Sequence, residues 1–436
     1  LSHLVFVLIT YILSILMSAT THSLSKQEIA RFSRQLMLKG IGPSGQERIR
    51  ETKVLIIGAG GLGCPVSMYL VAAGIGRLGI VDHDVVSIDN LHRQTMHDQK
   101  RVGQSKADSL KESLSRINNE ANVVAYNVLL TSKNVLQLFR DYDIVADCSD
   151  NVATRYLIND ACVLSGKPLV YGSALGWEGQ FTVYNNGTNC PCFRCIFPDP
   201  PSPEHVMSCS EAGVLGPVVG VIGSLQALEI IKIAVSGKSS FAGNLWMFDG
   251  FEGISKRISL REKMSNCAIC SENPRITELQ DYQKFCRSDP SDKVRSLCLL
   301  SAEQRVSPTE YLNLRNKIGG SFILLDVRPP TEFEICHLPE AENFPWEELR
   351  RAKMEMIIDK INNSMERKSP TINGAGNNGK TKVFVVCHHG NDSQLAACHL
   401  HKQLSEAGIG DRFIVRDIVG GMDGWALEVD ADFPRY

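Results

Sequence analysis

The sequence predicts an α/β protein with two consecutive domains: a larger one with a mostly parallel sheet, then a smaller α/β domain. The chain has 436 residues, more than the roughly 250 to 300 at which a single hydrophobic core stops growing. Short apolar runs typical of buried strands alternate with helical patterns along both halves, as in parallel sheets covered by helices.

The first domain is predicted over residues 25–275. It opens with Ser25-Lys-Gln-Glu28, which fits the capping box of a helix over 29–38. The elements expected next are a strand over 54–57, a helix over 65–73 and a strand over 78–81, then a strand over 143–147, a helix over 153–165 and a strand over 169–171. The first three form a β-α-β unit.

The second domain is predicted over residues 301–436, after a linker over 276–300 where periodicity is lost. Its expected elements are a helix capped by Ser307-Pro-Thr-Glu310, strands over 322–327 and 383–387, and a helix over 394–404. The Asn- and Gly-rich run 373–379 is expected to be a mobile surface insertion.

Composition excludes several classes of protein. The net charge of −2 provides no general attraction for nucleic acid or an anionic membrane, so we expect neither as a direct partner. Fourteen cysteines in a chain this long, four of them in C-x-x-C pairs, indicate metal ligands in a reducing compartment and therefore the cytosol.

The N-terminal 24 residues are expected to be an extension outside the fold. Residues 4–17 are almost wholly apolar and could pass for the core of a signal peptide, but they are shorter than the ~20 residues that span a bilayer. They lack a basic flank, and the chain opens on Leu1 rather than Met, so we interpret this stretch as non-functional.

A glycine-rich loop predicts a nucleotide site. Gly58, Gly60 and Gly63 satisfy G-x-G-x-x-G between a strand and a helix, where backbone N–H groups can approach phosphates. Asp82 stands about 20 residues further on, where an acidic side chain binds ribose hydroxyls. The glycines alone do not separate NAD from ATP. The charged residues that follow suit a triphosphate and Mg²⁺, which favours ATP: the run 89–93, Lys106 and the run 147–151.

Two C-x-x-C pairs predict a closed tetrahedral zinc site, formed by Cys192, Cys195, Cys267 and Cys270. The pairs lie further apart than in a local zinc ribbon, so spacing alone is only moderate support. Cys190 is a neighbour that could compete as a ligand. Three other cysteines in apolar or helical settings are expected to be core thiols: Cys64, Cys148 and Cys162.

Two further cysteines are candidate nucleophiles. Cys387 ends an apolar strand and precedes a short loop and a helix, where backbone N–H groups and the positive helix end are expected to lower its pKa and stabilise a persulfide. Cys209 lies in a small, polar, flexible stretch; it can attack an activated carboxyl group or resolve an acyl disulfide, or it can be an idle loop thiol.

The first domain resembles the MoeB/ThiF and ubiquitin-activating adenylyltransferases. The motifs that carry the likeness are R-x-x-R-Q at 31–35, GAGGLG at 58–63, VDHDVV at 81–86, N-L-x-R-Q at 90–94 and CSDNVATRYLIND at 148–160. The resemblance implies a Rossmann-like ATP-binding domain with a structural zinc site, and a homodimer in which Arg34 reaches the neighbouring subunit's site. It also implies a nucleotide and Mg²⁺ site that includes Gly61, Asp82, Asp89, Asn90, Leu91, His92, Arg93, Lys106, Asp150 and Asn151. Within this set, Asn90, Arg93 and Lys106 would contact phosphates and Asp150 would hold Mg²⁺.

The second domain resembles a rhodanese domain through LDVRP at 325–329, the Cys387 loop, DIVGG at 417–421 and Gly424-Trp425. The loop ends on Ser393 where many rhodaneses place an arginine, which favours a protein persulfide over thiosulfate as donor. Arg328 either steadies the loop or forms a structural ion pair. His388 and His389 are expected to modulate the electrostatic potential at the loop without acting as bases.

Residues 25–436 as a whole resemble the two-domain adenylyltransferases and sulfurtransferases of molybdenum cofactor synthesis and tRNA thiolation. This implies adenylation of the C-terminal glycine of ubiquitin-like sulfur carriers, namely the ubiquitin-related modifier and the small molybdopterin-synthase subunit. Sulfur would then come from a persulfide on Cys387, loaded by a cysteine desulfurase, and the product would be a thiocarboxylate.

Two other classes of function stay open from the residues alone. A nicotinamide oxidoreductase would fit the glycine loop and would bind NADH, but it leaves the C-x-x-C pairs and Asp150-Asn151 without a role. A scaffold that only recruits ubiquitin-like proteins would support no ATP–pyrophosphate exchange.

Overall fold

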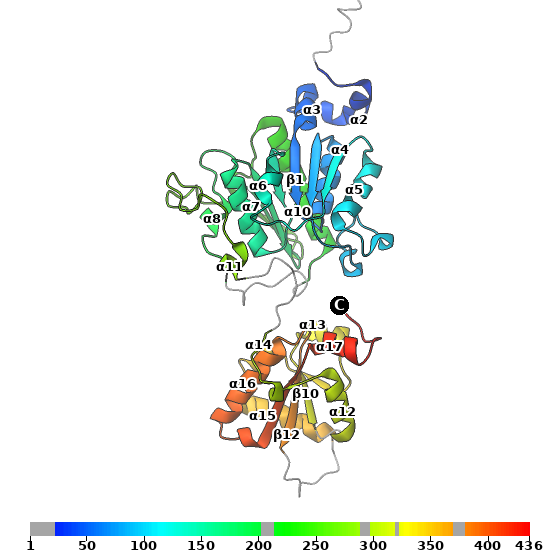
Figure 1. The fold of residues 1–436 in the computed structure, drawn as a ribbon, viewed down its shortest axis with the longest axis vertical. Helices are drawn as coiled ribbons and strands as arrows, with labels where there is room; N and C mark the ends of the chain where they lie inside the picture. The colour runs from blue at the N-terminus through cyan, green and yellow to red at the C-terminus, as the bar shows by residue number, and fades with distance from the viewer. Residues whose placement is uncertain (1–21, 202–212, 288–296, 319–321, 369–379) are drawn as a thin grey trace, which may run out of the picture. The chain divides into compact units, whose positions relative to one another are not determined.

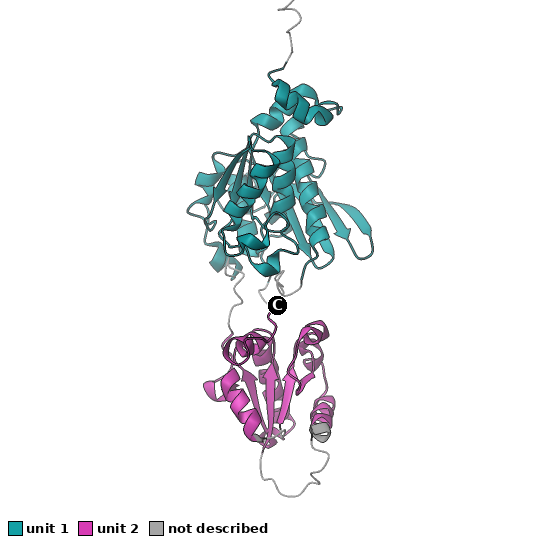
Figure 2. Ribbon diagram, turned by 90° about the vertical axis from the view of Figure 1, so that its right-hand side faces the viewer, with its two compact units in different colours: residues 1–292 teal, residues 293–436 magenta. Residues whose placement is uncertain are grey.

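The computed structural model describes residues 22–201, 213–287, 297–318, 322–368 and 380–436. The chain forms two compact units, Leu1–Asp292 and Lys293–Tyr436 (Figure 2). The apolar stretch 4–17, Cys209 and the Asn- and Gly-rich run 373–379 lie outside the described residues.

The first unit is built on one eight-stranded sheet in the order β3-β2-β1-β4-β5-β6-β7-β8 (Figure 1). Strands β3 to β5 in this order pair in parallel, and β5 to β8 pair antiparallel, so the predicted α/β class is confirmed. The strands are β1 (Lys53–Ile57), β2 (Arg77–Val81), β3 (Asn122–Tyr126), β4 (Ile144–Asp147), β5 (Leu169–Leu175), β6 (Glu178–Tyr184), β7 (Asn244–Asp249) and β8 (Ile254–Ser259).

Helices cover both faces of this sheet, because its central strands are apolar on both sides. One core lies under α3 (Gly42–Glu51), α4 (Gly63–Ala73), α5 (Lys106–Ile117) and α10 (Gly216–Ser236). The other lies under α6 (Val135–Phe139), α7 (Val152–Leu164), α8 (Phe193–Ile196) and α11 (Tyr282–Cys286).

Helix α10 is, within the described part of the chain, the one helix long and apolar enough by length and composition to cross a membrane. Its residues Val218, Ile222 and Ile230 are buried in the core that α10 shares with α4 and the sheet. Burial inside the unit therefore explains the apolar residues on one side of α10, whereas Leu228, 52% exposed, lies outside this core.

The capping box predicted at Ser25 is confirmed at the start of α2 (Lys26–Leu36). The Glu28 backbone N–H donates to Ser25 Oγ at 3.1 Å, and the Ser25 N–H donates to Glu28 Oε2 at 2.7 Å. Just before the cap, Ser23 Oγ lies 2.6 Å from Glu47 Oε1 on α3, and Leu24 is buried. Ordered packing thus begins slightly before residue 25.

The segment expected to be a linker, 276–300, belongs in part to the first unit. Residues 282–286 form α11, whose Tyr282 and Cys286 are buried against α7. The helix is one turn long, so its pattern is too short to show periodicity, and burial against α7 stabilises it instead. At the other end of the segment, Leu297 N–H donates to Asn391 Oδ1 at 2.8 Å in the second unit.

The second unit has a five-stranded parallel sheet in the order β11-β10-β12-β13-β9. Its strands are β9 (Arg305–Val306), β10 (Phe322–Asp326), β11 (Ala341–Asn343), β12 (Thr381–Val386) and β13 (Phe413–Ile418). Helices α14 (Trp346–Leu349), α15 (Met354–Lys368) and α16 (Asp392–Glu406) cover one face, and α12 (Pro308–Ile318) and α17 (Gly421–Glu428) cover the other. Helix α13 (Pro330–Ile335) follows β10.

Candidate functional site

A pocket that is partly open to solvent lies at the carboxyl edge of the first sheet between β1 and β4. Strand order reverses there, since β1 is followed along the chain by β2 on one side and has β4 on the other. Ligands of open α/β sheets bind at such switch points. The glycine loop forms one wall, so the fold places the predicted nucleotide motif at the position where this class of sheet binds ligands.

Close packing explains the glycines of this loop. A Cβ on Gly61 would lie 2.9 Å from Val219 Cγ2 on α10, and one on Gly63 would overlap the carbonyl oxygen of Gly58. Gly58 has φ of +102°, which side chains rarely adopt. The loop therefore stays tight against β1 and α10, with its backbone toward the pocket.

Ala59 holds the glycine loop in place through both its backbone N–H and its carbonyl oxygen. Its N–H donates to Asp82 Oδ2 at 2.7 Å, and its carbonyl oxygen lies 2.9 Å from His97 Nε2. His97 Nδ1 lies 2.8 Å from Ser109 Oγ. Because a carbonyl only accepts, Nε2 carries the proton and Nδ1 accepts from Ser109. Burial lowers the pKa of His97, which keeps the ring neutral for this role.

Lys106 provides the pocket's buried cation. Its Nζ donates to Asp84 Oδ2 at 2.9 Å. Burial opposes its charge, yet the carboxylates of Asp82 and Asp84 raise its pKa, so the ammonium stays protonated. Burial raises the pKa of Asp82, with Lys106 acting in the opposite direction. An anion entering the pocket meets a permanent positive charge.

Gln94 is a pocket residue for which no role was predicted from the sequence. It is 4% exposed, and its Oε1 has no hydrogen-bond partner among the described residues. A buried unpaired acceptor is costly, so it indicates a ligand that supplies a donor there. Together with the glycine loop and the pocket cations, which include Lys106 and Arg93, it makes the pocket fit a nucleotide.

The structure separates the remaining predicted nucleotide residues into two groups. Gly61, Asp82, Arg93, Lys106, Asp150 and Asn151 line the pocket. Beside it, on the turn after Ser87, lie Asp89, Asn90, Leu91 and His92. This turn supports Arg93, whose Nη1 donates to the Asp89 carbonyl at 2.9 Å and lies 2.7 Å from His92 Nε2.

The end of β4 and the loop after it carry one buried and one exposed acidic residue. Asn151 Oδ1 accepts from Thr154 N–H at 2.9 Å and caps α7. Asp147 is fully buried, and burial raises its pKa. Asp150 is exposed and lines the pocket, which makes it the carboxylate there that is best placed to hold a hydrated cation.

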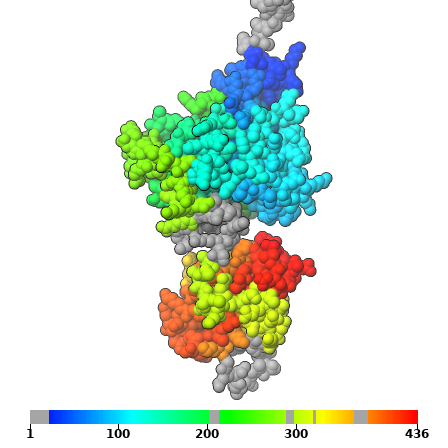
Figure 3. All heavy atoms as spheres, in the orientation of Figure 1, coloured from blue at the N-terminus to red at the C-terminus, as the bar shows by residue number. Residues whose placement is uncertain are grey.

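Arg34 lies away from the pocket of its own chain. It is exposed on α2, which packs with α3 at the amino edge of the sheet (blue in Figure 3). In that packing Phe32 meets Gly74, at the end of α4, and Arg31 donates to the Ile117 carbonyl at 2.6 Å. The pocket lies at the opposite, carboxyl edge.

The four predicted zinc ligands come together. Their sulfur atoms lie within 4.8 Å of one another, with 3.7 Å between Cys192 and Cys267 and 3.4 Å between Cys195 and Cys270. Tetrahedral bonds of 2.3 Å put sulfurs about 3.8 Å apart, so the cluster fits zinc. Cys190 is not part of it, because its Sγ donates to the Val183 carbonyl at 3.4 Å. The described cysteines form no disulfide.

A buried ion pair that the sequence did not predict supports the cysteine cluster. Arg194, between the first two cysteines, is 3% exposed and donates to Asp160 Oδ2 on α7 at 2.8 Å. Tyr282 on α11 donates to the same carboxylate at 2.7 Å. The guanidinium also lies over the rings of Tyr156 and Phe285. Helix α11 thereby shares with Arg194 a carboxylate on α7, which holds the segment between Cys192 and Cys195 in place.

Cys387 lies at the carboxyl end of β12 and is 3% exposed. The Gly390 N–H donates to its Sγ at 3.1 Å, as expected of a loop that stabilises anionic sulfur. The predicted direction of its pKa is wrong. Burial raises the pKa of the Cys387 thiol and outweighs the lowering by Ser393 and the backbone N–H groups. A fully buried thiolate costs more solvation than two or three hydrogen bonds return.

Ser393 connects the thiol to a buried ion pair. Cys387 Sγ donates to Ser393 Oγ at 3.4 Å, and Ser393 Oγ lies 3.5 Å from Asp417 Oδ2. Asp417 is paired with Arg305 at 2.9 Å. The position where many rhodaneses have a cation is therefore filled by a neutral hydroxyl backed by a carboxylate.

Arg328 forms a structural ion pair, one of the two roles expected for it. It is 1% exposed, and it donates to Asp326 from Nε, 2.9 Å from Oδ1, and from Nη2, 2.5 Å from Oδ2. His388, next to Cys387, is largely buried, and burial, with help from His389, lowers its pKa to about 4. It is therefore neutral near pH 7.

The fold and these sites define a nucleotide-binding α/β protein with an appended reactive-cysteine domain, and comparison with known proteins places it further. The ThiF family model matches residues 32–269, and the rhodanese-like domain model matches residues 307–428. The adenylyltransferase and sulfurtransferase MOCS3 of Caenorhabditis briggsae is 47% identical over 413 residues, 95% of this chain and 98% of that protein. The protein of the same name from Sus scrofa is 49% identical, over 95% of this chain and 89% of that protein.

The chain belongs to the ThiF family and, over nearly its whole length, to the MOCS3 family of adenylyltransferases and sulfurtransferases. This confirms the family resemblance found in the sequence. A crystal structure of E. coli MccB with MccA-N7isoASN matches with a TM-score of 0.51 at 21% identity, over 57% of this chain and 76% of that one. That likeness shows the fold alone.

Proposed function

We propose that this protein uses ATP to adenylate the C-terminal glycine of a ubiquitin-like sulfur carrier and then transfers sulfur to it from a persulfide on Cys387. The observation that carries the proposal is that one chain combines a glycine-loop pocket with a buried cation and a cysteine whose sulfur accepts a backbone N–H. The first site can activate a carboxylate, and the second can carry sulfane sulfur.

In the nucleotide half, Asp82 would bind ribose and Gly61 would let the backbone approach the nucleotide. Arg93 and Lys106 would compensate the charge that develops when a carboxylate attacks the α-phosphate and pyrophosphate leaves. Asp150 would hold Mg²⁺, which supplies further charge compensation. The turn 89–92 and Asn151 would keep Arg93 and the loop after β4 in place.

A second hollow offers the carrier's tail a route to this pocket. It lies along β5, β6 and β7, and Ala174 lines both it and the nucleotide pocket. Around it, large apolar side chains are exposed, including Trp177 at 49% and Phe251 at 71%. An exposed apolar patch beside a pocket is typical of a protein-binding surface.

The same reasoning supports a homodimer. Arg34 cannot serve its own pocket from the opposite edge of the sheet, so we propose that it reaches the pocket of a second copy. Exposed apolar residues Val221 and Leu228 on α10 are candidates for the interface.

In the sulfur half, a cysteine desulfurase would load Cys387, and the persulfide would attack the acyl adenylate and release AMP. The Cys209 thiolate would attack the Cys387 sulfur of the resulting acyl disulfide, which releases the thiocarboxylate and leaves a Cys209–Cys387 disulfide that an external thiol reduces; alternatively, Cys209 would form a thioester first. The zinc bound by the four-cysteine cluster would be structural. The thiocarboxylate formed on the ubiquitin-related modifier or the small molybdopterin-synthase subunit would supply tRNA wobble-uridine thiolation and molybdopterin synthesis. We place this work in the cytosol.

The test is to incubate the full chain with ATP, Mg²⁺, a persulfide donor and a carrier, and to weigh the carrier. We expect conversion of its terminal carboxylate to a thiocarboxylate, lost in Cys387→Ala and retained in the control Cys298→Ala, which removes an exposed thiol of the second unit. An unchanged carrier mass with both candidate carriers would overturn the proposal.

A further inference from the structure

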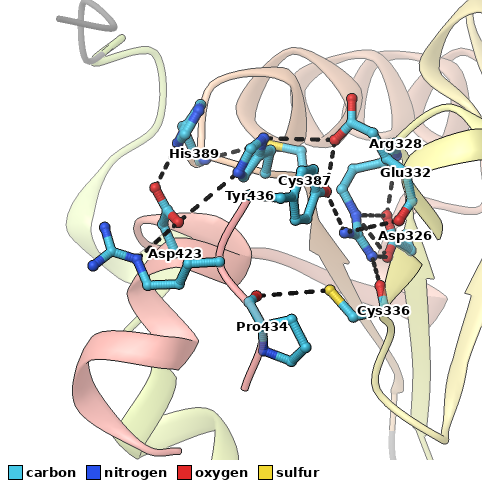
Figure 4. Close-up of polar contacts among 12 residues, drawn as sticks. Asp326, Arg328, Glu332, Cys336, Cys387, His389, Asp423, Pro434 and Tyr436 are labelled. Carbon is cyan, nitrogen blue, oxygen red and sulfur yellow. Dashed lines mark hydrogen bonds and ion pairs between the residues drawn. The ribbon is translucent and has the colours of Figure 1, made fainter. Parts of the chain in front are cut away.

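The segment 434–436 folds over the loop that carries Cys387 (Figure 4). Tyr436 contacts this loop, and Pro434 and Arg435 contact neighbouring segments. The Pro434 carbonyl accepts from Cys336 Sγ at 3.8 Å, Arg435 Nε donates to Asp423 at 3.4 Å, and the Tyr436 ring stacks on His388 at 4.3 Å. His388 is joined to Cys387 by a peptide bond, so Tyr436 bears directly on the sulfur loop.

Arg328 gives Tyr436 a fixed point of attachment. Its guanidinium is held by Asp326 and donates to the Cys336 carbonyl at 2.7 Å and to the Tyr436 hydroxyl at 2.6 Å. The same hydroxyl donates to Glu332 Oε2 at 2.8 Å. A buried guanidinium fixed in this way has one orientation, and both hydroxyl bonds involve charged groups, which makes them stronger than neutral ones.

His388 is thereby held between two rings. His389 stacks on its other face at 3.8 Å, and His389 Nδ1 is 2.9 Å from Asp423 Oδ2. The groups facing His388 are Glu332, Asp423, Arg328 and Arg435, and its Nε2 has no hydrogen-bond partner among the described residues. The His388 ring is therefore fixed by stacking more than by hydrogen bonding, and Tyr436 is one of the two rings that stack on it.

We propose that Tyr436 is a positioning residue for sulfur transfer. Arg328 holds its hydroxyl and its ring stacks on His388, and these two contacts keep the Cys387 loop in the conformation that points the Gly390 N–H at the sulfur. The inference rests on the proposed function, since it concerns the same persulfide. Tyr436 does not touch the sulfur. It acts through His388, and its loss leaves the loop more open and less well ordered for transfer.

The experiment uses the full chain with Tyr436→Ala, which removes ring and hydroxyl, and Tyr436→Phe, which keeps the stacking and removes both hydroxyl bonds. The matched control is Leu427→Ala, which truncates a 68% exposed side chain on the neighbouring helix α17. Three rates are measured: alkylation of Cys387 by iodoacetamide, thiocarboxylate formation on the carrier, and carrier-dependent ATP–pyrophosphate exchange.

We expect Tyr436→Ala to alkylate about tenfold faster, because loop opening is no longer opposed by these two contacts, and to form thiocarboxylate about tenfold more slowly in kcat at unchanged KM for the carrier. Tyr436→Phe is expected to lie between wild type and Tyr436→Ala, and Leu427→Ala to match wild type. A second signature is the pKa of His388, followed by NMR, which should rise from about 4 toward its ordinary 6.5 in Tyr436→Ala.

The inference is overturned if alkylation and transfer both stay at the wild-type rate in the two Tyr436 variants, or if both rates fall together. Should Tyr436→Ala fail to fold, Tyr436→Phe decides in the same way. Pyrophosphate exchange is expected to be unchanged in all variants. A wild-type chain that makes no thiocarboxylate would instead refute the proposed function, so the two failures are distinguishable.

Discussion

We predict that His97 sets the ATP affinity of the first unit, although it does not line the pocket. His97→Ala removes the ring N–H that donates to the Ala59 carbonyl at 2.9 Å. A buried carbonyl without a donor costs about 1 to 3 kcal/mol. The Cys64 thiol, 3.7 Å from the same oxygen, stays as a weak donor, so the lower part of this range applies, about 1 to 2 kcal/mol.

Converted at 1.4 kcal/mol per factor of ten, this loss corresponds to roughly 5- to 30-fold weaker ATP binding, because the glycine loop relaxes away from the shape that faces the phosphates. Equilibrium ATP binding and the KM for ATP in carrier-dependent pyrophosphate exchange should both show it, with kcat little changed. The matched control is Ser109→Ala, which removes the partner of Nδ1 and leaves the Ala59 bond intact. Wild-type ATP affinity in His97→Ala, or equal weakening in Ser109→Ala, would refute this reasoning.

Three further predictions follow from the geometry. Ser393→Ala removes the hydroxyl that can turn to donate to the Cys387 thiolate, a hydrogen bond that lowers the Cys387 pKa, so the pH profile of Cys387 alkylation should move to higher pH; a shift to lower pH would show that the hydroxyl acts mainly as an acceptor from the thiol. Chelating the zinc predicted at the four cysteines should lower the melting temperature of the first unit and leave persulfide loading of Cys387 unchanged, as checked by calorimetry and mass spectrometry. The pKa of His388 is about 4 in the folded chain and 6.5 in the unfolded chain, so its contribution to stability is present above pH 6.5 and is lost as pH falls toward 4. At pH 5 the loss is about 2 kcal/mol. Thermal melts of His388→Gln should not show this pH-dependent loss.

Local patterns predicted the parts of the fold that depend on chain neighbours. The Ser25 capping box, the turn at Gly58 and the position of Cys387 after an apolar strand are each set within a few residues, and the structure has all three. Helix α11 was missed because its stability comes from burying Tyr282 against Asp160, far away in the chain. A one-turn helix leaves no periodic signal for such a contact.

The sequence by itself determined the family, and it predicted the groups available for chemistry: a glycine loop for a nucleotide, four thiols for a metal, and one strand-end cysteine for sulfur. Only the tertiary structure decided how these groups are tuned. It buries Cys387 and so raises its pKa, places His97 under Ala59, and brings Tyr436 onto His388. These effects depend on desolvation and on contacts between residues distant in the chain, and neither is encoded in the spacing of a motif.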